Sequence, residues 1–263
     1  MNDSKKIFAG IDIGSMTTKC VIMDETDIIG NIVIPTDSAP KNAGIRALES
    51  VLEDIGFERS HIIRIVGTGY GRISLDIFDH TATELTCHAM GVRYVHPETE
   101  GIIDIGGQDS KAIKLKPDGS LLDFILNDKC AAGTGRFLEV MAKALKLDME
   151  TFGGLYEKSE HPCDINSTCI VFAESEVISL AAQGEAKTDI AAGLHKSIAR
   201  RVGNMAKRLG IRNNTAFVGG VAKNRGMRKA LEDYLGIEFI SLSINPQITG
   251  AIGAAVMARE QAG

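Results

Sequence analysis

The chain has 263 residues, of which 44% are hydrophobic and 24% are charged, and its formal net charge at pH 7 is −5. These values are typical of a globular protein with one large domain or two of about 100–150 residues each, and the negative charge argues against a nucleic-acid partner. No apolar run approaches the roughly 20 residues of a membrane span, and the polar start leads into a strand without a signal-peptide core, so we expect a cytoplasmic protein that does not enter a membrane.

The first predicted element is a strand–turn–strand hairpin. Apolar residues at 7–11 and 20–23 indicate two strands, and the segment between them is Asp12-Ile13-Gly14-Ser15-Met16-Thr17-Thr18-Lys19. In such a turn, glycine lets backbone N–H groups approach phosphate oxygens, hydroxyl groups add hydrogen bonds, and the leading aspartate can lie near a hydrated Mg²⁺. A single segment of this kind is weak evidence, because an ordinary hairpin turn can carry the same residues.

The elements that follow alternate between helix and strand. Residues 42–54 keep the apolar spacing of a helix, residues 62–66 form a β-branched strand, and 67–71 are a turn too rich in glycine for a helix. A further helix is predicted at 84–91. Pro97 and the polar residues after it mark a boundary, so we expect domains at residues 1–96 and 97–263.

The second half opens with the same hairpin. Apolar runs at 101–103 and 112–115 flank the segment Asp104-Ile105-Gly106-Gly107-Gln108-Asp109-Ser110-Lys111. Both copies follow the pattern D-I-G-[SG]-x-x-[ST]-K, and two copies in matching contexts favour a pair of facing phosphate-binding hairpins over two ordinary turns. After this hairpin we predict helices at 136–146, 170–182 and 189–209, a strand at 215–218, and helices ending near 234 and spanning 248–260.

Small residues in the last predicted helix, Gly250, Gly253 and Ala254, predict tight packing on a neighbouring element, and this helix could cross back to the first half. Strands followed by helices, made twice, predict an α/β fold with two related domains around a nucleotide cleft. The doubled hairpin and the turn Gly219-Gly220-Val221-Ala222-Lys223-Asn224 resemble the actin, sugar-kinase and heat-shock-protein-70 superfamily. That resemblance implies two duplicated actin-like (ribonuclease H-like) ATPase domains, with ATP as the ligand and the glycine turn on its adenosine side.

The cysteines distinguish between members of that superfamily. Five cysteines, an odd number, do not indicate a disulfide framework. Cys130 stands just before a glycine-rich helix start, in the segment 127–139, and Cys169 stands at another helix start, in the segment 167–176. A helix N-terminus lowers the pKa of a thiol. Two thiolates cannot fill the four ligand positions of a [4Fe–4S] cluster, but a two-fold dimer would supply the other pair.

Over essentially the whole chain, the segments N-D-K-C-A-A-G-T-G-R-F-L-E and S-T-C-I-V-F-A-E-S-E and the two hairpins resemble the activators of 2-hydroxyacyl-CoA dehydratases, relatives of the ATPase subunits of benzoyl-CoA reductase. The resemblance implies a homodimer with one [4Fe–4S] cluster between the subunits, held by Cys130 and Cys169. It also implies that ATP hydrolysis drives one low-potential electron, supplied by ferredoxin or flavodoxin, into a 2-hydroxyacyl-CoA dehydratase or a related CoA-ester reductase.

Two alternatives remain at this point. One is a sugar or small-acid kinase of the same fold without a cluster, and the other is an ATP-sensing interaction protein whose cysteines are incidental. Cys163 is outside the motif: we expect a packed or free thiol, with a swapped ligand or a redox thiol as the alternative. Cys20 and Cys87 lie in apolar or helical contexts and are expected to be small core residues.

The motif residues have expected roles. Asp12 and Asp104 would hold Mg²⁺ through waters, and Gln108 would orient the attacking water. The loop 15–19 would wrap the β- and γ-phosphates, with Lys19 either reaching phosphate or lying on the strand in solvent. The residues expected to contact the nucleotide are Gly14, Ser15, Met16, Thr17, Thr18, Lys19, Gly106, Gly107, Gly133, Gly135, Gly219, Gly220, Lys223 and Gln247, of which Lys223 and Gln247 follow from the resemblance alone.

Overall fold

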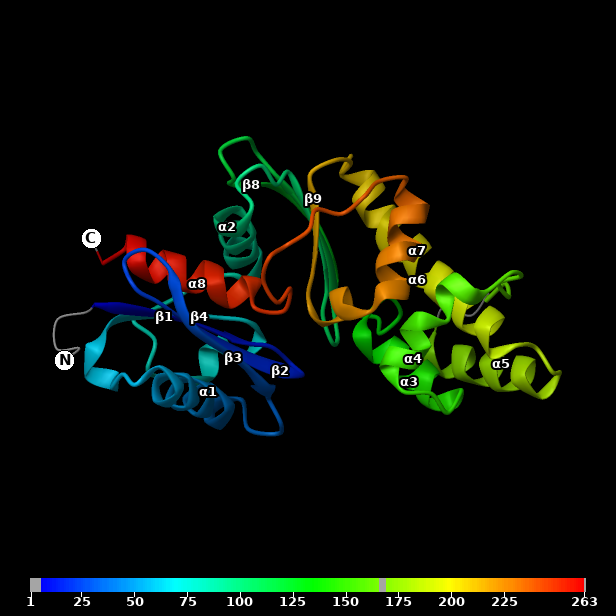
Figure 1. The fold of residues 1–263 in the computed structure, drawn as a ribbon, viewed down its shortest axis with the longest axis horizontal. Helices are drawn as coiled ribbons and strands as arrows, with labels where there is room; N and C mark the ends of the chain where they lie inside the picture. The colour runs from blue at the N-terminus through cyan, green and yellow to red at the C-terminus, as the bar shows by residue number, and fades with distance from the viewer. Residues whose placement is uncertain (1–5, 166–168, 263) are drawn as a thin grey trace. The chain divides into compact units, whose positions relative to one another are not determined.

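The computed structural model describes residues 6–165 and 169–262, so Ser167 and Thr168 of the second cysteine motif lie outside the described residues. The chain forms two compact units (Figure 1). The first unit comprises Met1–Thr99, Leu115–Leu121 and Leu242–Gly263, and the second comprises Glu100–Lys114 and Leu122–Ser241. The described part of the chain has no helix long and apolar enough to cross a membrane.

The first unit is built on a five-stranded sheet. Its strand order is β3-β2-β1-β4-β5, with β1 antiparallel to β2 and parallel to β4. The strands are β1 (Ile7–Ile13), β2 (Thr17–Met23), β3 (Ile28–Pro35), β4 (Ile62–Thr68) and β5 (His80–Thr81), and the helices are α1 (Pro40–Ile55), α2 (Glu84–Val95) and α8 (Thr249–Glu260).

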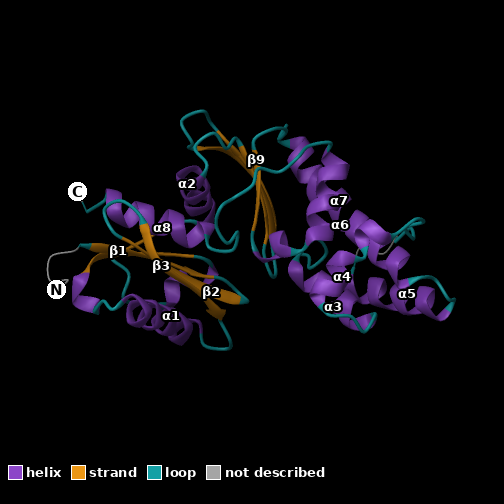
Figure 2. Cartoon of the chain, viewed as in Figure 1, coloured by secondary structure: helices purple, strands orange, loops and turns teal. Residues whose placement is uncertain are grey.

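Both faces of this sheet are covered, because side chains alternate along each strand. On β2, Cys20 and Ile22 face the cluster around α1, whereas Val21 and Met23 face the cluster around α8. Figure 2 shows α1 on one side of these strands and α8 on the other. The predicted tight packing of the last helix is confirmed: a Cβ atom added at Gly253 would overlap the carbonyl oxygen of Cys87 in α2.

The described residues of the second unit form a four-stranded sheet and five α-helices. The strand order is β8-β7-β6-β9, with β6 antiparallel to β7 and parallel to β9. The strands are β6 (Gly101–Ile105), β7 (Ser110–Leu115), β8 (Leu121–Asn127) and β9 (Thr215–Val218), and the helices are α3 (Gly135–Ala144), α4 (Met149–Gly154), α5 (Ile170–Ala182), α6 (Lys187–Arg208) and α7 (Arg225–Leu235).

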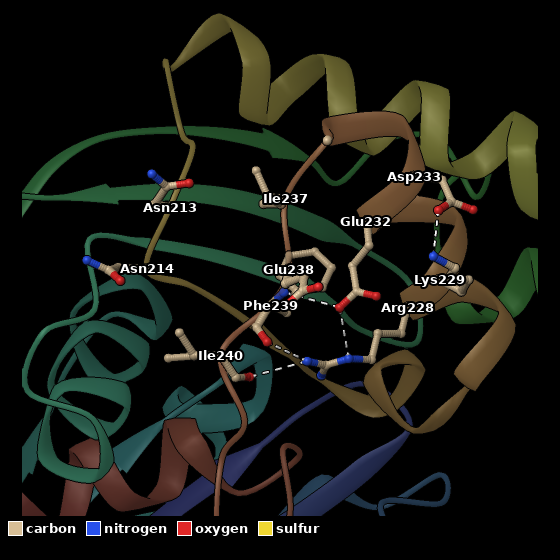
Figure 3. A pocket seen from close by; sticks show the side chains of 11 residues that line it. Asn213, Asn214, Arg228, Lys229, Glu232, Asp233, Ile237, Glu238, Phe239 and Ile240 are labelled. Atoms are coloured by element: carbon tan, nitrogen blue, oxygen red, sulfur yellow. Dashed lines mark hydrogen bonds and ion pairs between the residues drawn. The ribbon is translucent and has the colours of Figure 1, made fainter.

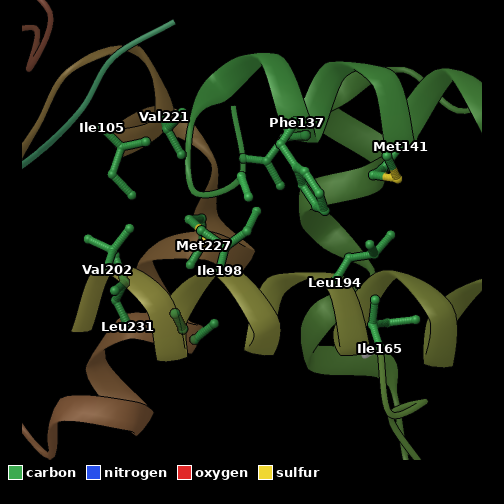
Figure 4. Packing of buried hydrophobic residues seen from close by; sticks show 14 of the residues in the cluster. Ile105, Phe137, Met141, Ile165, Leu194, Ile198, Val202, Val221, Met227 and Leu231 are labelled. Atoms are coloured by element: carbon green, nitrogen blue, oxygen red, sulfur yellow. The ribbon is translucent and has the colours of Figure 1, made fainter. Parts of the chain in front are cut away.

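The core of the second unit joins buried side chains of its strands to those of its helices. Figure 4 shows part of this cluster, with Ile105 beside side chains of the helices. Leu194, Ile198 and Val202 recur every four residues along α6 and so share one buried face. They pack with Phe137 of α3 and Met227 of α7. This core fixes the helices that begin near the predicted cysteine ligands to the strands of the second hairpin.

Candidate functional site

The first hairpin joins β1 to β2 and contains an ion pair at its base. Asp12 and Lys19 are direct partners across the two strands, and Lys19 Nζ lies 3.1 Å from Asp12 Oδ2. The side chains are 13% and 7% exposed for Lys19 and Asp12 respectively, so Lys19 is not a solvated strand residue. The turn is closed by a hydrogen bond from Gly14 N to Thr17 O of 3.1 Å.

Thr36, just after β3, stabilises this turn from behind. Its hydroxyl donates to Gly14 O at 2.8 Å and lies 2.9 Å from the hydroxyl of Thr18. Thr18 is fully buried, so its hydroxyl supports the turn instead of facing a ligand. Ser15 and Thr17 are half-buried, which leaves these two as the hydroxyl groups of the turn that can reach a phosphate.

The second hairpin repeats this arrangement between β6 and β7. Asp104 and Lys111 are again direct partners, with Lys111 Nζ 3.0 Å from Asp104 Oδ2. Lys111 also lies 2.6 Å from Asp109 Oδ2, and Gly106 N donates to Asp109 O at 3.0 Å. Gln108 is exposed at the tip of the turn. No role was predicted for Lys111, although its place in the shared pattern could have indicated one.

A glycine backbone lies directly against the carboxylate of each aspartate. Gly69 follows β4 and Gly219 follows β9, the strands parallel to β1 and β6, and their φ values are +88° and +86°. A Cβ atom at Gly69 would lie 2.5 Å from Asp12 Oδ1, and one at Gly219 would overlap Asp104 Oδ1 in the same way. Gly219 was predicted from the Gly219-Gly220 turn, whereas its counterpart Gly69 was not.

Each hairpin can therefore supply backbone amides and a paired carboxylate for binding phosphate, and the first adds the hydroxyl groups of Ser15 and Thr17. Within residues 6–165 and 169–262 no group of three or more His, Cys, Asp or Glu side chains could hold a metal ion. Mg²⁺ usually keeps several waters and takes one or two carboxylates together with substrate phosphates. The roles of Asp12, Asp104 and Gln108 stay predictions.

Helix α3 begins directly on the second hairpin. Gly135 N donates to Gly106 O and Arg136 N donates to Gly107 O, both at 2.8 Å. A side chain at Gly135 would press on this contact, because its Cβ atom would lie 3.1 Å from Gly106 O. Gly133, just before the helix, has a φ of +89° beside Arg201 of α6. Both predicted glycines thus have a packing role, and their contact with a nucleotide stays a prediction.

Cys130 lies on the loop that leads into α3, and Cys169 is the N-cap residue of α5, a helix that packs on α3. Cys130 is half-buried on the loop before α3, and Cys169 is the exposed residue that precedes α5. The helix α5 packs on α3 and keeps large apolar side chains in solvent: Val171 is 63% exposed and Phe172 is 67% exposed. Two accessible thiols with an apolar surface beside them fit half of the ligand set of a shared iron–sulfur cluster.

The surroundings of Cys163 disfavour a thiolate. Burial and the carboxylates of Glu185 and Asp189 raise the pKa of its thiol, and its sulfur lies 4.0 Å from Glu185 Oε2. These neighbours oppose a thiolate, which is the form that binds iron. Cys20 and Cys87 are fully buried, as predicted, and burial raises the pKa of Cys87 to about 12.

The two remaining predicted residues belong to different units. Lys223 ends the short 3₁₀ helix that follows Gly219, in the second unit, and Gln247 precedes α8 in the first unit. A pocket in the second unit lies elsewhere, around the segment before β9 and the end of α7 (Figure 3). It is at the opposite end of β9 from Gly219, and its described lining contains none of the predicted site residues.

Comparison with known proteins places these features in a family. Residues 9–258 match the BadF/BadG/BcrA/BcrD ATPase family. The chain is 45% identical to the 2-hydroxyisocaproyl-CoA dehydratase activator of Clostridioides difficile over 96% of this chain and 95% of that protein. It is 44% identical to the (R)-2-hydroxyglutaryl-CoA dehydratase activating ATPase of Acidaminococcus fermentans over 96% of this chain and 97% of that protein.

Solved structures agree with the sequence relatives. The activator of the 2-hydroxyisocaproyl-CoA dehydratase from Clostridium difficile, with bound ADPNP, superposes with a TM-score of 0.92 at 44% identity, over 97% of this chain and 95% of that one. The ethanolamine utilization protein EutJ from Carboxydothermus hydrogenoformans has a TM-score of 0.60 at 14% identity, over 95% and 89% of the two chains, a likeness of fold alone. The predicted α/β, actin-like ATPase fold is confirmed.

Proposed function

The chain belongs to the BadF/BadG/BcrA/BcrD ATPase family, and from this premise we propose that it is an ATP-hydrolysing activator that delivers a low-potential electron to a 2-hydroxyacyl-CoA dehydratase or a related CoA-ester reductase. The observation that carries this proposal is that activators of such dehydratases align with the chain from end to end. In this proposal the two hairpins would bind the nucleotide. Cys130 on the loop before α3, and Cys169 at the start of α5, would hold the cluster.

The hairpins are the nucleotide-binding elements of the proposal. Turn amides and the hydroxyls of Ser15 and Thr17 hold phosphate oxygens, and Asp12 and Asp104 hold Mg²⁺ through waters. Gln108 orients the attacking water from the exposed tip of the second turn. The relative with bound ADPNP supports ATP and ADP as the ligands.

Cys130 and Cys169 would hold a [4Fe–4S] cluster together with the same two residues of a second copy of the chain. Such a cluster supplies a one-electron carrier of low potential. The exposed apolar side chains of α5, including Ile178, support a homodimer in which this helix is covered by its copy. Ferredoxin or flavodoxin is the proposed electron donor, and the cytoplasm is the proposed location.

The kinase alternative has less support, because relatives that cover more than nine-tenths of the chain are activators. An anaerobic assay separates the two functions. The purified protein, dithionite, MgATP and the 2-hydroxyisocaproyl-CoA dehydratase of Clostridioides difficile are mixed, and dehydratase activity is followed. We expect activation with ATP and none with ADPNP. Phosphate transfer to a sugar or a small acid, without dehydratase activation, would exclude the proposal.

A further inference from the structure

We propose that Asn127 is a positioning residue that couples the second hairpin to the loop that carries Cys130. The inference deepens the proposed function and rests on it. Asn127 is the last residue of β8, and β8 lies beside β7, which begins at Ser110. One side-chain amide nitrogen therefore stands where the hairpin, the edge strand and the cysteine loop meet.

The carboxamide of Asn127 bridges these three elements. Its Nδ2 atom lies 3.3 Å from Ser110 Oγ, 3.0 Å from Cys130 O and 3.0 Å from Ala132 O. Two of these neighbours are carbonyl oxygens, which only accept hydrogen bonds, so the nitrogen and not the oxygen of the carboxamide faces them. The contact with Ser110 reaches the hairpin, and the other two fix the backbone on both sides of Ala131.

The far end of the same loop is attached to the hairpin as well. Gly135 N and Arg136 N donate to the carbonyl groups of Gly106 and Gly107. Inside the loop, the hydroxyl of Thr134 donates to Ala131 O at 2.7 Å. The segment 128–134 is therefore fixed to the hairpin at both ends, and a movement of the hairpin turn on exchange of nucleotide would displace the Cys130 backbone with it.

A role in coupling differs from a role in stability alone. A residue that only fills space at the end of β8 would affect unfolding, but it would not affect how Cys130 responds to nucleotide. Asn127→Ala removes the bridge, and Asn127→Asp keeps the shape while placing carboxylate oxygens against two carbonyl oxygens. Both variants should therefore weaken the coupling, whereas Asn31→Ala, at an exposed position on β3, is the matched control.

The test uses the full-length protein prepared without iron. The alkylation rate of Cys130 by iodoacetamide is measured by mass spectrometry with saturating MgADP and with saturating MgADPNP, and the affinity for each nucleotide is measured separately. We expect the two rates to differ by about threefold or more in the wild type and in Asn31→Ala. This is the size of effect that the free energy of one hydrogen bond can produce. In Asn127→Ala the ratio should approach one, while the nucleotide affinities stay within about threefold.

A full nucleotide-dependent rate difference in Asn127→Ala would overturn the inference, and so would equal rates in a wild type that binds both nucleotides. A wild type that binds neither nucleotide would instead contradict the proposed function, so the two failures are distinguishable. If Asn127→Ala does not fold, Ser110→Ala removes only the contact with the hairpin. It should reduce the rate ratio partly, and an unchanged ratio would contradict the coupling.

Discussion

Lys111 and Asp104 face each other across the second hairpin, with Nζ 3.0 Å from Oδ2, and the pair is almost fully enclosed. The pair formed by Lys19 and Asp12 repeats this relationship in the first unit at 3.1 Å. The second pair differs because Asp109 is also in contact with the lysine. Lys111 thus balances two carboxylates at the base of the turn, whereas Lys19 is paired with one.

Removing Lys111 should therefore destabilise the protein strongly. Lys111→Met would leave Asp104 and Asp109 close together without their cation, and breaking a buried pair in this way costs about 3–5 kcal/mol. The free energy of unfolding in urea measures the loss. Lys41→Met, which breaks an exposed pair with Asp76, should cost about 0–1 kcal/mol. Equal losses in the two variants would show that the buried pair is not a special feature of the hairpin.

Substitution of Gly219 should impair the site more than its backbone strain alone predicts. Gly219→Ala combines a φ of +86° with overlap against Asp104, whereas Gly236→Ala has a φ of +68° and open space around the new Cβ atom. The control should lose about 1–2 kcal/mol of stability. Gly219→Ala should lose more and should also weaken ADPNP binding, as measured by calorimetry. An ADPNP affinity equal to that of the wild type would show that this turn is not part of the nucleotide site.

Gln108→Ala should slow ATP hydrolysis without weakening nucleotide binding. Gln108 is exposed at the tip of the second turn, and misplacing the attacking water should lower the rate roughly 10- to 100-fold. Phosphate release under steady-state conditions and the affinity for ADPNP are measured together. Gln261→Ala, at an exposed position after α8, is the control. If Gln108→Ala turned over ATP at the wild-type rate, another residue would have to orient the water.

Stability should fall in mild acid because of His195. Burial among α6, Phe152 and Tyr156 lowers the pKa of His195, so the unfolded chain binds more protons than the folded one as the pH falls through about 6.5. Above that pH, burial of the neutral His195 side chain has no protonation cost. Below it, the free energy of unfolding falls as the pH is lowered. The Tm of thermal unfolding should fall more steeply between pH 7.5 and 5.5 for the wild type than for His195→Gln. An equal fall of the Tm in both proteins would show that His195 is not the cause.

Several elements could be predicted from the sequence because local signals agreed with the tertiary structure. The strand at 215–218 and the helix at 170–182 match β9 and α5 residue for residue. In contrast, β3 and β8 were not predicted. β3 is mostly half-buried and contains Gly30 and Asn31, and β8 exposes Leu122 and Phe124, so neither strand carries a clear alternation of buried and polar residues.

Within the candidate site, the sequence indicated the residue types of each hairpin but not their pairing. The aspartate and lysine of each pattern are seven residues apart, and only the strand register brings them opposite each other. Thr18 was expected to contact nucleotide, but its hydroxyl lies against that of Thr36. Thr36 directly follows β3, a strand that was not predicted. Asn127 opens the first cysteine motif, yet its contacts depend on the neighbouring strand β7.

We propose that Cys130 and Cys169, and not Cys163, provide the iron ligands of an ATP-driven electron carrier. The most direct measurement is the iron content of anaerobically purified wild type, Cys130→Ser, Cys169→Ser and Cys163→Ser. We predict about two iron atoms per chain in the wild type and in Cys163→Ser, because one four-iron cluster serves two chains, and loss of iron in the other two variants. An iron-free wild type, or loss of iron in Cys163→Ser alone, would contradict the account.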